Sequence, residues 1–272
     1  MSYKTILVQL NDKRRAEQLL EPTCFLARKF DSHVIGLHVR PDKFASTIPS
    51  LGGQIGTASA GQRDSDELAD MFADMTANKP FTAQWQIVEQ IGFDIGEAVM
   101  RHARYADLIV AGQPDPDWPL SAALDIPERL VLESGRPVLV IPYAGRCQEV
   151  GRIAMIAWKP TREAARAVFD ALPLLMSASS VQILEVSEDV ARTAPDALIA
   201  ETLGRHGIKA KQRVSGASGI SAGDEILSRL ADATADLLVM GAYGHSRMRE
   251  IVFGGVTRHI ARHMTAPTLW SH

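Results

Sequence analysis

The sequence predicts two tandem α/β domains, each built on an open, doubly wound sheet of five parallel strands. Three observations lead to this prediction: an internal repeat, a regular alternation of strands with amphipathic helices, and short strands without polar alternation. Strands that are apolar throughout are typical of parallel sheets whose two faces are covered by helices. Strands that alternate with helices imply right-handed crossovers between parallel neighbours.

The repeat is visible in two blocks. Residues 95–112 read IGEAVMRHARYADLIVAG and residues 222–241 read AGDEILSRLADATADLLVMG, so their final glycines lie 129 positions apart. ESGRPVLVIPY at 133–143 corresponds to HMTAPTLWSH at 263–272, with prolines 130 positions apart. So constant an offset indicates a duplication.

The first strands of the two halves match as well, TILVQLND from Thr5 against RIAMIAWKP from Arg152. We therefore expect a first domain over residues 1–144 and a second over residues 151–272. The boundary is predicted near Ala144, just after the last strand of the first half.

In the second half, strands and helices are expected to alternate from start to end. The expected strands lie at residues 152–158, 180–186, 209–215, 236–240 and 267–270. The expected helices lie at residues 162–176, 195–205, 222–233 and 256–264. Two helix starts, one in each half, show an N-cap residue followed by an acid three residues later. They are Asp94 with Glu97 in the first half and Ser221 with Asp224 in the second.

Composition excludes several function classes. Among 272 residues, 46% are apolar and 22% are charged, as in globular proteins with sizeable cores. The formal net charge of −3 argues against a nucleic-acid or membrane-surface partner. The start of the chain lacks a signal-peptide pattern, and no apolar run reaches the ~20 residues of a membrane helix. The two cysteines, Cys24 and Cys147, form no CxxC pair, so we expect a reducing, cytoplasmic location.

One segment of the first half has no counterpart in the second. Residues 41–61 read PDKFASTIPSLGGQIGTASAG, which is rich in Gly, Ser, Thr, Ala and Pro. Connections longer than about 12–15 residues are usually disordered or functional. The segment is interpreted either as a disordered or inert insertion or as a lid for a ligand or partner.

The stretch most informative about chemistry is GAYGHSRMREIVFGGVTRHI, residues 241–260. Gly241 and Gly244 flank a turn at the end of the fourth strand, and Gly254 and Gly255 precede the last helix. Glycine lets the backbone approach a ligand closely, and a helix N-terminus suits a phosphate. The alternative is that these glycines serve only turns and a helix start. The predicted phosphate-binding residues are Gly241, Gly244, Ser246, Gly254, Gly255, Val256 and Thr257.

The spacing of Gly241, Gly244 and Gly254 resembles the nucleotide motif of the universal stress protein family, and the repeat resembles its tandem members. The resemblance implies a Rossmann-like fold of the adenine nucleotide alpha hydrolase kind. It implies ATP as the ligand, with Mg²⁺ as a candidate companion ion, phosphates on the glycine loops and adenosine near the end of the first strand. It also implies dimer-like packing through the last strands of the two domains.

Two positions depart from the family pattern. Gly255 stands where the family usually has Ser or Thr, although its backbone N–H can still serve a phosphate. Lys159, preceded by Trp158, stands where ATP-binding members carry an Asp that helps to hold adenosine. Because lysine offers no hydrogen-bond acceptor, Lys159 either removes adenosine recognition or contacts an anionic group of the ligand. The corresponding residue of the first half is Asn11.

The first half lacks the glycine motif. Only Gly112 remains, and the residues that follow it are acidic or lack an N–H group. These residues are Pro114, Asp115, Pro116, Asp117, Pro119 and Asp125. We therefore expect at most one nucleotide per chain.

Metal and catalytic sites are weaker candidates. His259 and His263 share a helix face and could bind zinc with His245 or His272, but no carboxylate or thiolate completes the set, and a surface pair is preferred. No GxGxxG follows a strand and no GxxxxGK[ST] occurs. No catalytic residue is predicted.

The predicted function is a stress-response regulatory protein that binds ATP or a related nucleotide in its second half, with slow hydrolysis at most. Its expected partners are the nucleotide and, through self-association, its own domains or a second chain. The alternative is an interaction module that binds no nucleotide and engages a partner through residues 41–61. An enzyme of unrelated chemistry on the same fold is the third possibility.

Overall fold

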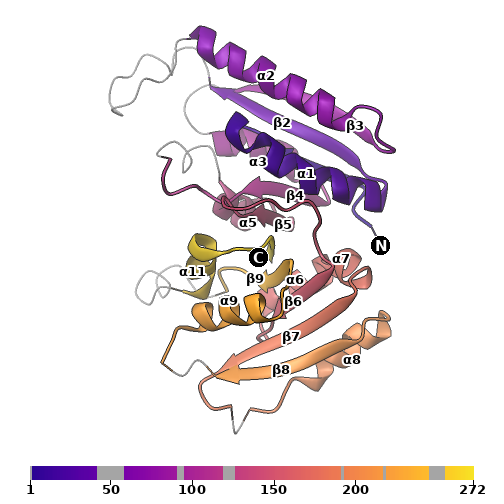
Figure 1. The fold of residues 1–272 in the computed structure, drawn as a ribbon, viewed down its shortest axis with the longest axis vertical. Coiled ribbons are helices and arrows are strands. Elements are labelled where there is room, and N and C mark those ends of the chain that lie inside the picture. Colours follow the sequence, from indigo (N-terminus) through magenta and orange to yellow (C-terminus); the bar gives the residue numbers. More distant parts are fainter. Residues whose placement is uncertain are drawn as a thin grey trace. The chain divides into compact units, whose positions relative to one another are not determined.

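The fold is described from a computed structural model of the full chain (Figure 1). The structure describes residues 2–41, 58–90, 95–118, 126–190, 193–216, 219–244 and 255–272. Its contacts divide the chain into two units, Tyr3–Arg136 and Pro137–His272.

The unit Tyr3–Arg136 contains a parallel sheet in the order β3-β2-β1-β4. Its helices form two packed pairs, α1 with α2 and α3 with α5. The strands are β1 (Thr5–Gln9), β2 (His33–Pro41), β3 (Thr82–Gln90) and β4 (Leu108–Gly112). The helices are α1 (Lys13–Phe30), α2 (Ala58–Thr76), α3 (Ile95–Ala103) and α5 (Pro127–Glu133).

The unit Pro137–His272 contains a sheet in the order β5-β10-β9-β6-β7-β8. Its strands are β5 (Val138–Ile141), β6 (Ile153–Ala157), β7 (Ser180–Ser187), β8 (Ala210–Gly216), β9 (Leu237–Gly241) and β10 (Thr268–Ser271). Its helices are α6 (Arg162–Asp170), α7 (Leu172–Met176), α8 (Ala197–Arg205), α9 (Ala222–Asp232) and α11 (Val256–His263). The order β8-β7-β6-β9 repeats the order β3-β2-β1-β4 of the other unit.

The five strands expected in the second half are present and parallel, and a sixth strand joins them. This strand, β5, is the one that the repeat assigns to the end of the first half. It runs antiparallel to β10, with Leu139 opposite Leu269. The sheet of this unit is therefore mixed at one edge.

The helix expected at residues 162–176 is observed as two helices, α6 and α7, which meet at Ala171. Pro173 accounts for the break, because proline lacks an N–H and its ring clashes with the carbonyl four residues earlier. The predicted cap Ser221 is confirmed, since its Oγ accepts the N–H of Asp224 at 3.1 Å. Asp94 lies outside the described residues.

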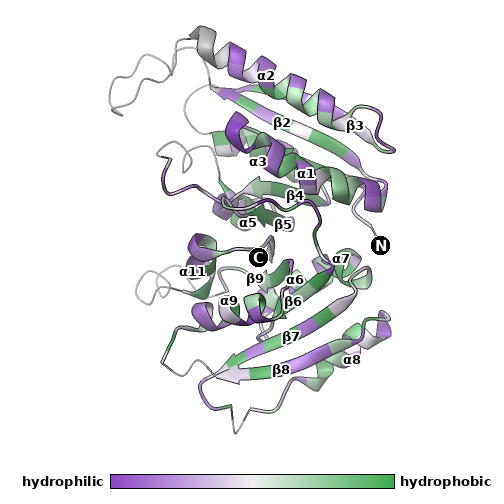
Figure 2. Cartoon of the chain, viewed as in Figure 1, coloured by the Kyte–Doolittle hydropathy of each residue, from purple (hydrophilic) through white to green (hydrophobic). Residues whose placement is uncertain are grey.

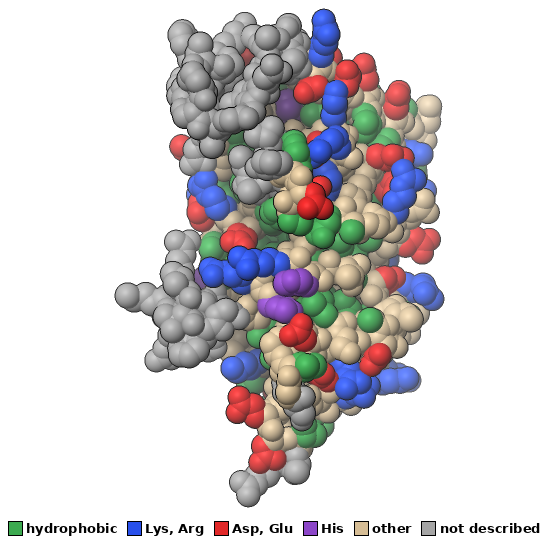
Figure 3. Space-filling view, turned by 60° about the vertical axis from the view of Figure 1, so that its left-hand side comes forward, with side chains coloured by type: hydrophobic (Ala, Val, Ile, Leu, Met, Phe, Trp, Pro, Cys, Tyr) green, Lys and Arg blue, Asp and Glu red, His purple; other side chains and the backbone are tan. Residues whose placement is uncertain are grey.

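The core consists mainly of the central strands and the inner faces of the helices (Figure 2). Every residue of β4, β5 and β10 is buried, including Trp270 at 0% exposure. On the face drawn in Figure 3, acidic and basic side chains are interspersed over the described surface. No helix among the described residues combines the length and apolar character needed to cross a membrane.

Candidate functional site

A cavity of about 620 Å³ lies at the carboxyl ends of β6, β7 and β9 in the unit Pro137–His272. β6 stands between β7 and β9, so the direction in which strands are added reverses here. In open α/β sheets this position is where ligands bind. The volume falls within the range of roughly 300–1,000 Å³ that is typical of small-molecule sites.

The structure brings together most of the residues that the sequence singled out. The cavity is lined by six of them: Lys159, Gly241, Gly244, Gly255, Val256 and Thr257. Ser246 and Gly254 lie outside the described residues. The end of the first strand and the start of the last helix, about 100 residues apart in the chain, therefore share one cavity.

Three helices begin at this cavity, and they differ in how their first turns are capped. Thr161 caps α6 and Ser221 caps α9, each by accepting a backbone N–H with its hydroxyl oxygen. α11 begins after Gly255 without any side-chain cap. Among the described residues, no side chain caps its first N–H groups, and these groups, with the positive end of the helix dipole, suit an anionic group of a ligand.

Apolar side chains line the same cavity as this helix start. They include those of Trp158, Val186, Ile226 and Met240. Trp158 is fixed by its indole N–H, which donates to Asp196 Oδ2 at 2.9 Å. An apolar wall with an oriented aromatic ring suits the flat ring of a nucleobase.

Gly241 allows helix α6 to approach the end of β9. A Cβ at this position would lie 2.4 Å from the backbone N of Ala164 and 2.5 Å from the carbonyl carbon of Glu163. No side chain other than hydrogen fits between two backbones so close. Gly241 thus places the first turn of α6 against the glycine loop.

Glu163 is one of the lining residues that the sequence reasoning missed. Its side chain is 9% exposed, and its Oε2 lies 2.7 Å from where a Cβ on Gly244 would be. Burial raises the pKa of the carboxyl, but its own backbone N–H and the neighbouring Arg162 outweigh burial and hold the pKa below its ordinary value. The carboxylate is therefore a negative charge in the wall beside the glycines.

The sequence carried only a weak signal for this role. Glutamate in the first turn of a helix is common, because it interacts favourably with the positive end of the helix dipole. Nothing local indicates that the Glu163 side chain turns inward. Only the approach of α6 to Gly241 and Gly244 makes it part of the cavity.

Lys159 is exposed at the cavity wall. Within the described parts of the chain, no carboxylate lies close enough to form an ion pair with it. Its ammonium group can donate to an anion but cannot accept a hydrogen bond. This arrangement agrees with the interpretation in which Lys159 contacts an anionic part of a ligand.

Thr257 lines the cavity and also bonds to the backbone of the glycine loop. Its Oγ1 accepts the N–H of Tyr243 at 3.4 Å, and the residue is 5% exposed. Tyr243 has a φ of 57°, in the left-handed region that side chains other than glycine rarely adopt. The contact helps to hold this turn of the glycine loop against α11.

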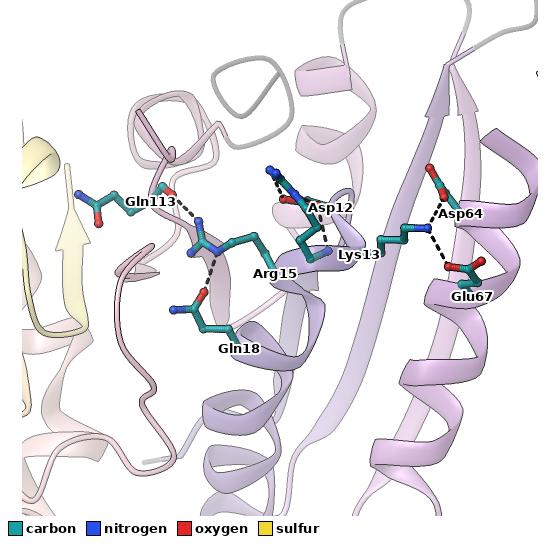
Figure 4. Close-up of polar contacts among 8 residues, drawn as sticks. Asp12, Lys13, Arg15, Gln18, Asp64, Glu67 and Gln113 are labelled. Atoms are coloured by element: carbon teal, nitrogen blue, oxygen red, sulfur yellow. Dashed lines mark hydrogen bonds and ion pairs between the residues drawn. The ribbon is translucent and has the colours of Figure 1, made fainter. Parts of the chain in front are cut away.

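In the other unit, a side chain at the start of α1 bonds to the loop after β4 (Figure 4). Arg15 is buried, and its guanidinium donates to the carbonyl of Gln113 at 2.6 Å and to Gln18 Oε1 at 2.8 Å. Arg14 covers the ring of Trp118 at 3.6 Å. These contacts fold the loop after β4 onto the start of α1.

Of the histidine pair, His259 lies beside the carboxylate of Asp224, and His263 stacks on the ring of His259. His259 Nε2 lies 2.9 Å from Asp224 Oδ1, and the rings of His259 and His263 stack at 4.5 Å. His272 Nδ1 is bonded to the carbonyl of Ala242. Among the described residues, no three His, Cys, Asp or Glu side chains come together as a metal ion requires.

Comparison with known proteins gives a family for the second half and a fold for the whole chain. Residues 168–271 match the universal stress protein family. A universal stress protein from Archaeoglobus fulgidus DSM 4304 superimposes with a TM-score of 0.77 at 17% identity, covering 100% of this chain and 96% of its own. No curated protein sequence matches the chain.

Two proteins from Pseudomonas aeruginosa are similar over nearly the same length. A putative universal stress protein from strain UCBPP-PA14 has a TM-score of 0.55 at 15% identity, covering 99% of this chain and 93% of its own. A functionally unknown protein from strain PAO1 has the same TM-score of 0.55 and identity of 15%, covering 99% and 92%. Residues 168–271 therefore match the universal stress protein family, and the strand order β3-β2-β1-β4 of the first half repeats the order β8-β7-β6-β9 of the second.

Proposed function

We propose that the protein is a regulatory nucleotide-binding protein of the stress response, and that its second half binds ATP or a related nucleotide. The observation that carries the proposal is the start of α11, which has no side-chain cap, on a cavity that apolar side chains also line. A nucleotide has the matching chemistry, a flat base at one end and phosphate at the other. Lys159 supplies a second donor for the anionic part.

The nucleotide acts as a signal rather than as a substrate. Among the lining residues that the structure describes, no nucleophile is paired with a base, and hydrolysis in this proposal is slow at most. A ligand that binds only the folded state stabilises that state by mass action and shifts its contacts with partners. Cys24 and Cys147 are not joined in a disulfide, which fits our proposal of a reducing, cytoplasmic location.

The test is direct. Purified protein is denatured by heat, the released small molecules are separated by anion exchange, and the native protein is titrated calorimetrically with ATP and Mg²⁺. We expect one nucleotide per chain, and replacement of Gly244 by Val should abolish binding because its side chain enters the cavity wall. The matched change Asp115→Asn in the first half should leave binding unchanged. Equal loss in both variants would place the site elsewhere.

A second candidate function is an interaction module without a nucleotide. The closure of the first-half site by Arg15 and Arg14 favours it, because this half keeps the fold without keeping a site. If neither released nucleotide nor heat of binding is found, this candidate takes precedence. Removal of residues 42–57 should then weaken binding to the partner while leaving thermal stability unchanged.

A further inference from the structure

Glu163 brings a negative charge into the cavity wall, while the guanidinium of its ion-pair partner Arg162 lies mostly in solvent. Its Oε1 accepts from Arg162 Nε at 3.0 Å, but the Arg162 side chain is 77% exposed while that of Glu163 is 9% exposed. Water screens an exposed guanidinium strongly, whereas a carboxylate shielded from water keeps most of its field inside the wall. The interior of the cavity therefore experiences the charge of Glu163.

The negative charge of Glu163 repels a phosphate that carries no bound cation. The uncapped start of α11 and the carboxylate of Glu163 line the same cavity, so a phosphate held by that helix shares the space with a second anion. Lys159 carries a single charge and is exposed to solvent. A nucleotide polyphosphate brings several negative charges, and among the described lining residues Lys159 is the one lysine or arginine present to balance them.

A divalent cation between the carboxylate and the phosphate would neutralise this repulsion. Mg²⁺ is commonly held by one or two protein carboxylates together with phosphate oxygens of the substrate. The oxygens of Glu163 are of this ligand type, and Oε2 lies beside Gly244, where the glycine loop meets the cavity. We infer that Glu163 sets the charge of the accepted ligand: phosphate-bearing nucleotides bind only with a divalent cation, which Glu163 faces. This inference rests on the proposed function.

The experiment is calorimetric titration of the full chain with ATP and with adenosine, each in EDTA and in Mg²⁺. Wild type is compared with Glu163→Gln and with Glu201→Gln, a matched change of an exposed carboxylate on α8. For wild type and Glu201→Gln, we expect ATP to bind at least about tenfold more tightly with Mg²⁺ than in EDTA. In Glu163→Gln this ratio should fall close to one, mainly through tighter binding in EDTA. Adenosine affinity should stay the same throughout.

A second readout follows the metal itself. With Mn²⁺ in place of Mg²⁺ and ATP present, electron paramagnetic resonance should detect less protein-bound Mn²⁺ for Glu163→Gln than for wild type at equal nucleotide. Thermal unfolding of the variant checks that its fold is retained.

The outcomes separate this inference from the proposed function. ATP binding by wild type that is equally tight in EDTA, or a metal dependence that Glu163→Gln leaves intact, overturns the role of Glu163. Binding of adenosine but of no phosphate-bearing nucleotide in Mg²⁺ overturns it too. Absence of any nucleoside or nucleotide binding, in wild type and variant alike, overturns the proposed function first.

Discussion

Arg15 and Glu163 occupy equivalent positions in the two halves of the protein and carry opposite charges. The pairing of β1 with β4 and of β6 with β9 aligns Ile6 with Ala154, and the same shift of 148 positions relates Arg15 to Glu163. Both side chains are buried in the first turn of the helix that follows the first strand.

The two charges have opposite consequences for the loop that each faces. The Arg15 guanidinium donates to the carbonyl of Gln113, so the loop after β4 is held by its own chain. The Glu163 carboxylate lies against Gly244 and leaves a cavity with an anionic wall. The equivalent first-turn side chain thus bonds to a loop carbonyl in one half and lines a cavity in the other.

Gly241→Ala should destabilise the second half, because the new Cβ meets backbone atoms of Glu163 and Ala164 that cannot rotate away. We expect a loss of about 1–3 kcal/mol in the free energy of unfolding, the usual cost of overpacking. Gly204→Ala is the control. It lies on α8, where an added Cβ would have no atom within 4 Å, and it should gain up to about 1 kcal/mol from helix propensity. Urea denaturation followed by circular dichroism measures both, and equal effects would contradict the packing explanation.

Arg15→Ala should destabilise the first half, since two hydrogen bonds and buried side-chain packing are lost together. The expected cost is about 1–3 kcal/mol, and it arises in the unfolding of the unit Tyr3–Arg136. Arg28→Ala, an exposed position in the last turn of α1, should change stability by no more than about 0.5 kcal/mol. Hydrogen exchange of α1 and β4 amides reports the local effect. Unchanged protection in Arg15→Ala would show that Arg15 does not hold the loop.

Stability should fall in acid in part through Glu225. Hydrogen bonds from Ser215 and from Arg229 Nε, the latter at 2.7 Å, lower the pKa of its carboxyl below the ordinary 4.5. Because the folded pKa is the lower one, the stabilising contribution is fully present above about pH 4.5 and is lost as pH falls through the folded pKa. Glu225→Gln should therefore be less stable at pH 7 and show a shallower loss of stability below pH 4.5. Parallel pH profiles for wild type and variant, measured by urea denaturation, would rule this contribution out.

The two cysteines should react with Ellman's reagent at different rates. Cys24 is 6% exposed and burial raises the pKa of its thiol, whereas Cys147 is partly exposed. We expect one thiol to react rapidly in native protein and the second only on unfolding, because the thiolate is the reactive form. Cys147→Ser should remove the rapid phase. Two rapid equivalents in native protein would indicate that α1 and α2 open readily around Cys24.

Much of the fold could be predicted because its signals are local. A few neighbouring residues are enough to indicate a short apolar strand, an amphipathic helix or a cap such as Ser221. The repeat offset adds a signal that only a comparison of the two halves of the sequence reveals. The antiparallel pairing of β5 with β10 was not specified in this way, because a strand's hydrophobic pattern does not name its neighbour. The break at Ala171 follows from Pro173, a local signal that the helical pattern of the surrounding residues concealed.

The sequence by itself determined the candidate site as a set of glycines at a strand exit and a helix start, together with Lys159 after the first strand. Spacing along the chain is enough for this, because parallel strands bring their carboxyl ends to one edge of the sheet. Only the tertiary structure decided the charge of the site. Whether a first-turn side chain such as Arg15 or Glu163 faces solvent, a loop carbonyl or a glycine depends on how closely helix and loop backbones approach, and that distance is set by packing across the whole domain.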